Sequence, residues 1–293
     1  MTDFAIIGFG EVGSIFARDL RAGGAGAIHA YDVLEAARDR AKASGATVHA
    51  TAAEAAAKAE VVFISVTAGS ALAAAQSLAG ELSHAPFVVD VNSISPGAKI
   101  ENAGIVNAAG GRYVEAAVMA SVPPKGLRSP ILLGGKDAQG FIDVMQPFGM
   151  DLTIFSEEIG KASSVKMCRS VMVKGLEAIT TECMLAARHY GVEKEVLASL
   201  HDTLPHEDWR GLARYVISRA LIHGKRRAEE VREVARTVQE AGLEPMLSRA
   251  IAERQDWAAG RGREMSKALL ATDDLDTLLD GITATMNHKA AAE

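Results

Sequence analysis

The segment "GFGEVG" (Gly8 to Gly13) constrains the fold of this chain more than any other feature. It fits the pattern G-x-G-x-x-G, follows the apolar run "DFAII" directly, and opens a stretch with helical character from Glu11 to Arg21. In that context the first glycine permits a tight turn, the second lets the backbone approach a pyrophosphate, and the third lets helix and strand pack closely. The sequence therefore predicts a dinucleotide at this loop rather than a glycine turn without a ligand. The residues expected to contact it here are Gly8, Phe9, Gly10, Glu11, Val12, Gly13, Tyr31 and Asp32.

Asp32 bears on which dinucleotide is bound. It ends the second predicted strand, 19 residues after Gly13, where a carboxylate accepts hydrogen bonds from the adenosine ribose. A carboxylate there repels a 2′-phosphate, so NAD is the expected cofactor. Arg38 and Arg40 follow on the next helix and leave NADP open, unless they are solvated helix charges.

Strand-like and helix-like segments alternate through the first half of the chain. The predicted strands lie in "DFAII", "AIHAYD", "ATVHA", "EVVFISVT", "APFVVDVNS", "GRYVEAAVMAS", "SPILLGG" and "MDLTIFS". Two helix starts are marked by Thr51 with Glu54, and by Ser95 with Pro96. From Lys161 onward only helical periods remain. We therefore predict a Rossmann-like α/β domain with a mostly parallel sheet over residues 1–157, and an all-α domain over residues 158–293.

Composition excludes several classes of protein. A net charge of −6 argues against a nucleic-acid binder, which needs a basic footprint. No run of 18 apolar residues suggests a membrane span, and no basic region or cleavage site precedes the first strand. Two cysteines, Cys168 and Cys183, make no disulfide framework, which fits a reducing cytoplasm. The polar stretch "HDTLPHED" has no recognised zinc spacing, so no metal site is expected.

Several motifs together resemble the β-hydroxyacid dehydrogenase superfamily, which includes 6-phosphogluconate and 3-hydroxyisobutyrate dehydrogenases. "VVDVNSISP" resembles the family's strand that ends in Asp, "EAAVMAS" its substrate loop, and "IGKASSVK" the start of its interdomain helix, with Gly160, Ala162 and Lys166 in register. The resemblance covers roughly the first 180 residues. It implies that Val66, Thr67, Asn92 and Ser93 contact the cofactor, and that Met119, Ala120 and Ser121 line the substrate site.

Departures from the family pattern leave the substrate open. Met119, Ala120 and Ser121 replace a Ser-Gly-Gly sequence, and Arg169 and Ser170 replace an Asn-Asn pair. The chain resembles more closely a less-studied phosphogluconate-dehydrogenase-like branch, whose substrate cannot be carried over from the better-known branches. Oxidation coupled to decarboxylation stays open.

Hydride transfer needs a group that takes or returns the hydroxyl proton, and Lys166 is our candidate for that group. A lysine shielded from water gives up its proton more readily. Ser170 lies one turn further along the same helix face and is expected to bond the reacting oxygen. Lys174 and His223 are candidate contacts for an anionic substrate, whereas Lys161 and Arg169 are interpreted as structural charges.

The apolar residues of the same helix predict which of its faces is buried. They recur at helical spacing, as Ala162, Val165, Cys168, Val171, Met172 and Gly175. Cys168 is therefore expected to be a core thiol, and Met167, Met172 and Met184 core packing.

Taken together, these features predict a cytoplasmic NAD(P)-dependent oxidoreductase acting on a small, anionic, hydroxyacid-type molecule. Family resemblance implies a homodimer or higher homo-oligomer. An imine reductase-like enzyme and a non-catalytic dinucleotide-binding protein are the alternatives.

Overall fold

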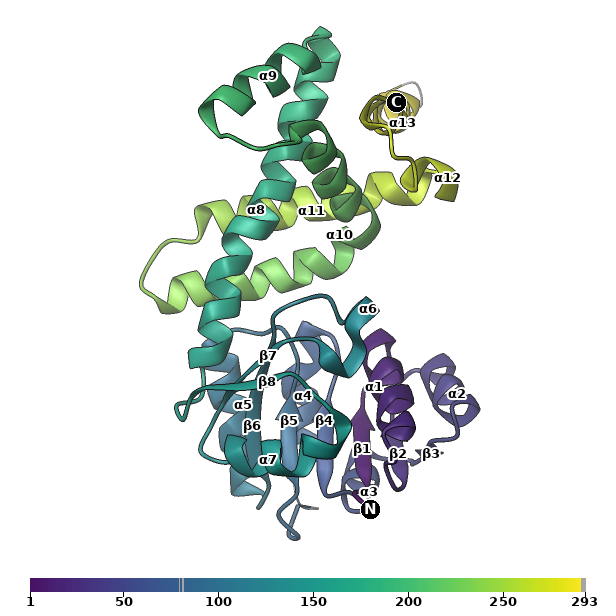
Figure 1. Cartoon of the computed structure of the whole chain (residues 1–293), viewed down its shortest axis with the longest axis vertical. Coiled ribbons are helices and arrows are strands. Elements are labelled where there is room, and N and C mark those ends of the chain that lie inside the picture. The colour runs from purple at the N-terminus through teal and green to yellow at the C-terminus, as the bar shows by residue number, and fades with distance from the viewer. Residues whose placement is uncertain (79, 81, 291–293) are drawn as a thin grey trace. The chain divides into compact units, whose positions relative to one another are not determined.

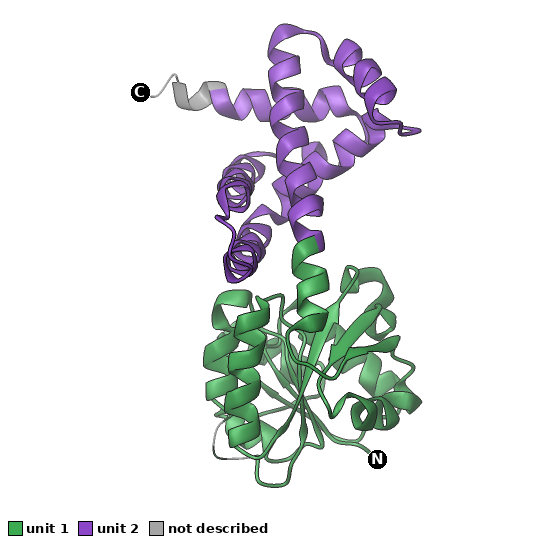
Figure 2. Cartoon of the chain, turned by 90° about the vertical axis from the view of Figure 1, so that its left-hand side faces the viewer, with its two compact units in different colours: residues 1–168 green, residues 169–293 purple. Residues whose placement is uncertain are grey.

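A computed structural model describes residues 1–78, 80 and 82–290 of the chain. The chain forms two compact units, residues 1–168 and residues from 169 onward (Figure 2). The predicted boundary at residue 157 lies at the turn before a long helix, whereas the compact units divide inside that helix. Within the described residues, no helix is both long and apolar enough to cross a membrane.

The first unit contains one eight-stranded sheet with the order β3-β2-β1-β4-β5-β6-β7-β8 (Figure 1). Only β6 and β7 pair antiparallel, so the predicted mostly parallel sheet is confirmed. Each expected strand is present. The strands are β1 (Phe4–Ile7), β2 (Ile28–Tyr31), β3 (Thr47–Val48), β4 (Val61–Ile64), β5 (Phe87–Asp90), β6 (Arg112–Val118), β7 (Ile131–Gly134) and β8 (Leu152–Ser156).

Helices cover both faces of this sheet because its central strands are apolar on both sides. Along β1, Phe4 and Ile6 enter one core cluster, whereas Ala5 and Ile7 enter the other. The first cluster contains residues of α1, α2 and α7, and the second contains residues of α3, α4 and α5. This is the doubly wound arrangement that the alternation in sequence predicted.

The predicted helix starts of the first unit are also confirmed. Thr51 Oγ1 accepts a hydrogen bond from Glu54 N at 3.1 Å, and Ser95 Oγ accepts one from Ala98 N at 3.2 Å ahead of a first-turn proline. The helices here are α1 (Glu11–Ala22), α2 (Glu35–Ala43), α3 (Ala52–Ala56), α4 (Ala71–Gln76), α5 (Pro96–Ala108), α6 (Val122–Lys125) and α7 (Ala138–Met145), with 3-10 turns η1 (Ala68–Ser70), η2 (Gly126–Arg128) and η3 (Gln146–Phe148).

The second unit is entirely helical over its described residues. Two of its helices, α10 and α11, approach closely because glycines lie at the contact. A Cβ on Gly224 would be 2.4 Å from the Gln255 carbonyl oxygen, and one on Gly262 would be 2.3 Å from that of Leu221. The elements are α8 (Lys161–Tyr190), which begins in the first unit, α9 (Glu193–Thr203), α10 (Trp209–Glu240), α11 (Met246–Glu264), α12 (Lys267–Leu270) and α13 (Leu275–Ala290).

One prediction about α8 is wrong. Ala162, Met167 and Met184 are buried as expected, but Cys168 is exposed and the Met172 side chain is 75% exposed. The buried face further along α8 instead carries polar residues, including Lys174, Glu177 and Thr181. Of the predicted face, Ala162 and Gly175 are buried, whereas Cys168 and Met172 are exposed, so helical spacing identified residues that share a face but not which of them the fold covers.

Candidate functional site

The predicted cofactor residues of the first unit gather at one edge of the sheet. Strands β1, β2, β4, β5 and β6 run parallel, so their carboxyl ends meet at the same edge. The glycine loop follows β1, Asp32 follows β2, Val66 and Thr67 follow β4, and Asn92 and Ser93 follow β5. The strand order reverses between β1 and β4, which is where open α/β sheets bind ligands.

The glycine loop has the geometry of a phosphate cradle. Gly8 has a φ of +94°, and a Cβ there would lie 2.6 Å from the Ser65 carbonyl oxygen. A Cβ on Gly13 would lie 2.3 Å from the Gly8 carbonyl oxygen, so only glycine lets α1 pack this close. A Cβ on Gly10 would meet no atom within 4 Å. Gly10 therefore faces open space at the N-terminus of α1, as an approaching pyrophosphate requires.

Asp32 joins the glycine loop to the end of β2. One carboxylate oxygen accepts a hydrogen bond from Phe9 N at 2.7 Å, and the other accepts one from Leu34 N at 2.8 Å. Arg38 donates to the carbonyl oxygens of Asp32 and Val33, both at 2.9 Å, and Arg40 donates to that of Phe9 at 3.1 Å. The two arginines thus donate to backbone carbonyl oxygens around Asp32, although Arg40 is exposed.

A buried ionic network holds the loop after β5. The fully buried Asp90 carboxylate contacts Lys99 Nζ at 3.0 Å and accepts hydrogen bonds from Tyr113 Oη at 2.9 Å, Asn102 Nδ2 at 3.1 Å and Asn92 N at 2.9 Å. Lys99 Nζ also donates to the Asp90 carbonyl oxygen at 2.6 Å. Burial and the nearby Asp90 and Glu115 raise the pKa of Tyr113 well above its usual value. Tyr113 therefore stays a protonated donor to Asp90.

Asn92 has a side chain that the protein leaves without partners. It is only 5% exposed, yet within the described part of the chain neither its amide nitrogen nor its amide oxygen has a hydrogen-bond partner. A buried amide without partners is costly unless a ligand supplies them. A carboxamide such as that of nicotinamide offers both a donor and an acceptor, so the residues present fit the predicted cofactor.

Glu115 anchors the first turn of α8. This carboxylate is fully buried and accepts hydrogen bonds from Gly160 N at 2.7 Å and Ser163 N at 2.6 Å. A Cβ on Gly134 would lie 2.4 Å from it, so glycine in β7 makes room for the carboxylate. A carboxylate at a helix N-terminus satisfies orphan amides and complements the helix dipole. Glu115 thereby sets where α8 begins.

Lys166 lies less than two turns beyond this anchor. Its Nζ donates a 2.6 Å hydrogen bond to Ser93 Oγ, so the candidate proton-transfer group meets the loop that carries Asn92. In the predicted substrate loop, Met119 is half-buried, and Ala120 and Ser121 are exposed after the end of β6. These residues belong to the first unit, together with the glycine loop.

The remaining candidates belong to the second unit. Lys174 is 6% exposed and pairs with Glu230 at 2.9 Å, and it also donates to Ser170 Oγ at 3.2 Å. Burial, with the nearby Arg219, Arg226 and Arg227, lowers the pKa of His223 to about 4. His223 is therefore a neutral imidazole at pH 7. The substrate contacts expected of Lys174 and His223 stay predictions.

Sequence reasoning missed Lys99, Asn102, Tyr113 and the anchoring role of Glu115. Lys99 on a helix has the pattern of a solvated charge, and only its contact with the buried Asp90 at the end of the preceding strand reveals otherwise. Glu115 was interpreted as the start of the substrate loop, whereas it lies within β6. The available signal was a carboxylate inside an otherwise apolar strand, since a buried charge requires a partner.

Comparisons with known proteins agree with this geometry. Residues 3–146 match the model of the NAD binding domain of 6-phosphogluconate dehydrogenase, and residues 187–258 match a domain of unknown function, DUF1932. The first match supports NAD(P) as the cofactor of the first unit.

Similar solved structures extend over nearly the whole chain. A conserved hypothetical protein from Sinorhizobium meliloti 1021 is 36% identical, with 96% of each chain covered and a TM-score of 0.75. A conserved protein of unknown function, described as structurally similar to 3-hydroxyacid dehydrogenases, is 30% identical, with 89% of this chain and 99% of that chain covered and a TM-score of 0.69.

Matches at lower sequence identity support the fold alone. The 3-hydroxyisobutyrate dehydrogenase of Mycobacterium tuberculosis, solved with L-serine, shares the fold at 17% identity, with 97% of this chain and 99% of that chain covered and a TM-score of 0.66. An uncharacterised 28.5 kDa protein of Methanothermus fervidus is 27% identical over 159 residues. That match covers 54% of this chain and 61% of the curated relative.

Substitutions at two glycines of the loop are predicted to have different effects, one on NAD affinity and the other on stability. Gly10→Ala adds a methyl group in open space, so we expect an unchanged midpoint of urea unfolding but NAD affinity lowered at least about tenfold, since the methyl blocks the pyrophosphate. Gly13→Ala is the contrasting variant. Its methyl meets the Gly8 carbonyl oxygen, so unfolding should require about 1–3 kcal/mol less free energy. Equal losses of stability in both variants would contradict this account.

The Asp90–Lys99 pair is predicted to be a large contributor to stability. Lys99→Met leaves a buried carboxylate without its cation, so the free energy of unfolding should fall by about 3–5 kcal/mol in urea titrations. Lys42→Met is the control. It removes an exposed ion pair with Asp39 and should change the free energy by less than about 1 kcal/mol.

Proposed function

The chain belongs to the 6-phosphogluconate dehydrogenase-like β-hydroxyacid dehydrogenase superfamily, and we propose that it transfers a hydride between NAD(P) and a hydroxyacid-type alcohol or carbonyl. The observation that carries the proposal is the 2.6 Å hydrogen bond from Lys166 Nζ to Ser93 Oγ. It joins a lysine able to exchange a proton to the loop whose Asn92 amide fits a nicotinamide carboxamide. Proton transfer by a positioned side chain contributes typically about 10²–10⁴-fold to rate.

The roles of the residues follow from this arrangement. The glycine loop and Asp32 hold the pyrophosphate and the ribose, and the bound NAD(P) supplies or accepts the hydride. Lys166 takes the hydroxyl proton at Nζ in oxidation and returns it in reduction. Ser93 orients Lys166, and Ser170, four residues further along α8, contributes a second hydroxyl for the reacting oxygen.

We propose that the substrate is a small anion. One of its substituents is less polar than the group that the family's substrate loop usually contacts. Met119 and Ala120 replace hydroxyl and glycine positions of the resembling loop, which favours a bulkier or more apolar substituent near Met119. We further propose that Lys174 and His223 contribute to this pocket, that the enzyme acts in the cytoplasm, and that it works as a homodimer or higher homo-oligomer.

Removing the Lys166 amine is the direct test of the proposed chemistry. Lys166→Met should lower kcat by about 10²–10⁴-fold with NAD affinity nearly unchanged, because the proton-transfer group is lost but the cofactor residues remain. Steady-state rates over a panel of hydroxyacids and the matching carbonyl compounds measure this. Lys161→Met, which removes a 58% exposed amine from the same helix, should keep the wild-type rate. Wild-type turnover in Lys166→Met would refute the assignment.

The same panel distinguishes the alternatives. Turnover of cyclic imines but of no hydroxyacid would identify an imine reductase. NAD binding without turnover of any compound would identify a non-catalytic dinucleotide-binding protein.

Glu115 is predicted to position Lys166 without touching the reactants. Glu115→Gln replaces one acceptor by an amide NH₂ that faces a backbone N–H, so the first turn of α8 must shift. Because small misplacements of a reacting group are costly, kcat should fall at least about tenfold while the KM for NAD changes less than about twofold. The exposed change Glu101→Gln is the control. A kcat equal to that of wild type would exclude the positioning role.

Asp32 predicts a preference for NAD. Its carboxylate repels a 2′-phosphate, so kcat/KM should be higher with NAD than with NADP in parallel assays. A tenfold preference for NADP would overturn this prediction and indicate that Arg38 and Arg40 accommodate the extra phosphate.

A further inference from the structure

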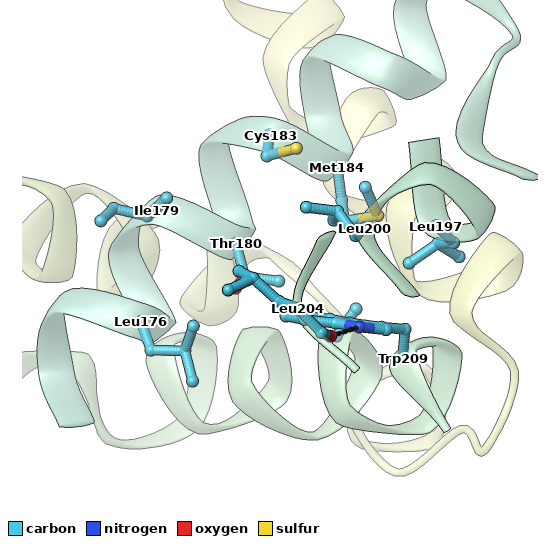
Figure 3. A pocket seen from close by; sticks show the side chains of 10 residues that line it. Leu176, Ile179, Thr180, Cys183, Met184, Leu197, Leu200, Leu204 and Trp209 are labelled. Atoms are coloured by element: carbon cyan, nitrogen blue, oxygen red, sulfur yellow. Dashed lines mark hydrogen bonds between the residues drawn. The ribbon is translucent and has the colours of Figure 1, made fainter. Parts of the chain in front are cut away.

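Two features lie apart from the residues that the proposed chemistry uses. One is an apolar hollow of about 120 Å³ in the second unit, whose lining includes Leu176, Leu200 and Trp209 (Figure 3). That volume is well below the ~300–1,000 Å³ of small-molecule pockets, and the Trp209 ring nitrogen already donates to the Leu204 carbonyl oxygen at 2.8 Å. The other feature is a polar contact in the first unit, made by the segment between β6 and β7.

This segment, residues 119–130, begins with the predicted substrate residues Met119, Ala120 and Ser121 and then forms α6 and η2. We refer to it as the α6–η2 loop. The sheet holds its two ends, because Met119 N donates to the Pro130 carbonyl oxygen at 2.8 Å, directly beside the paired strands β6 and β7. What the middle of the loop contacts therefore decides how the loop lies after it leaves the sheet.

Asp19 of α1 contacts the middle of the α6–η2 loop. One oxygen of its carboxylate accepts a hydrogen bond from Leu127 N at 3.1 Å, across 108 residues of sequence. The other oxygen faces Arg18 Nε and Nη2, both at 2.8 Å, and this pair orients the carboxylate. The loop is thus joined to α1 by a side chain whose direction is fixed by its neighbour.

Gly126 lets the backbone of the loop lie directly against Asp19. It has a φ of +60°, and a Cβ there would overlap the Asp19 carboxylate and lie 3.5 Å from Ile15 Cγ2 of the same helix. On either side of it, Val122 and Leu127 are buried in the core cluster that also contains residues of α1. Apolar packing and one polar contact together seat the loop on α1.

Helix α1 also carries the proposed pyrophosphate site. Its N-terminus follows Gly10, and Asp19 lies on the same helix roughly 12 Å from Glu11. The contact made by Asp19 therefore fixes the α6–η2 loop relative to the glycine loop, within the first unit.

We propose that Asp19 is a positioning residue, which fixes the α6–η2 loop to α1 and thereby sets where residues 119–121 meet the substrate. Asp19 acts through the backbone of Gly126 and Leu127 and touches no reactant. The effect on the substrate rests on the proposed function, whereas the effect on the loop does not.

Limited proteolysis tests how firmly Asp19 holds the loop. Lys125 and Arg128 are exposed, so trypsin can cut after either of them when the loop opens. Asp19→Ala removes the acceptor of the Leu127 amide, and cleavage at these two sites, followed by mass spectrometry, should become at least about tenfold faster. Asp19→Asn keeps an oxygen acceptor and should stay within about threefold of the wild-type rate. Asp39→Ala, which changes an exposed aspartate of α2, is the control and should leave the rate unchanged.

Steady-state kinetics test the consequence for the substrate. With a hydroxyacid that the wild type oxidises, Asp19→Ala should raise the KM for that compound at least about fivefold, while kcat and the dissociation constant of NAD change less than about twofold. A purely structural loss would weaken NAD binding as well. Asp19→Asn should return the KM to within about threefold of the wild-type value.

Three results would overturn the proposal. The first is a wild-type cleavage rate in Asp19→Ala, and the second is an unchanged KM in that variant although its loop is cut faster. The third is faster cleavage at all tryptic sites alike with a lower midpoint of urea unfolding, which would show general destabilisation. If the wild type turns over no compound, the proposed function fails, and proteolysis still decides whether Asp19 holds the loop.

Discussion

The candidate site depends on how two neighbouring buried carboxylates are compensated. Asp90 and Glu115 face each other in register on the paired strands β5 and β6, and both are fully buried. Like charges this close in a low-dielectric interior repel strongly unless each has its own partners. Asp90 takes an ammonium from Lys99, and Glu115 takes two backbone amides from the start of α8. The Asp90 network holds the loop that carries Ser93, and the Glu115 contacts set where α8, and with it Lys166, begins. The hydrogen bond from Lys166 to Ser93 therefore depends on both carboxylates.

Prediction succeeded where the signal was local. Alternating strands and helices, the glycine loop and the helix caps each depend on residues that are neighbours in the chain, and the structure confirms them. Glu115 acts through contacts with Gly160 and Ser163, which lie 45 and 48 residues further along the chain, and no single-sequence pattern encodes such contacts. Lys99 lies only nine residues after Asp90, but helical periodicity does not reveal that its side chain turns back to pair with the buried carboxylate. The error on α8 has a related cause. Periodicity identifies residues on one face, whereas only the tertiary fold decides what covers that face.

The positive charges at the start of α8 serve three physical roles. Lys161 pairs with Glu158 at the surface, Lys166 donates to Ser93, and Lys174 is buried against Glu230. The three lysines have similar neighbours in the sequence, and it is their contacts in the folded chain that give them different roles. The buried face of α8 in the helical unit is partly polar, and its charges are compensated by ion pairs such as Glu177 with Arg227 at 2.6 Å.

The double use of Asp32 has a consequence for cofactor engineering. A carboxylate has about four lone-pair sites, and the backbone amides of Phe9 and Leu34 occupy two of them, one on each oxygen. The usual conversion of an NAD enzyme to NADP removes this carboxylate. Here the same change would remove the acceptor of the Phe9 and Leu34 amides at the proposed pyrophosphate loop, so a redesign would have to supply new acceptors for both amides. If Asp32 selects the cofactor as proposed, cofactor identity and loop shape are linked through one side chain and cannot be selected independently.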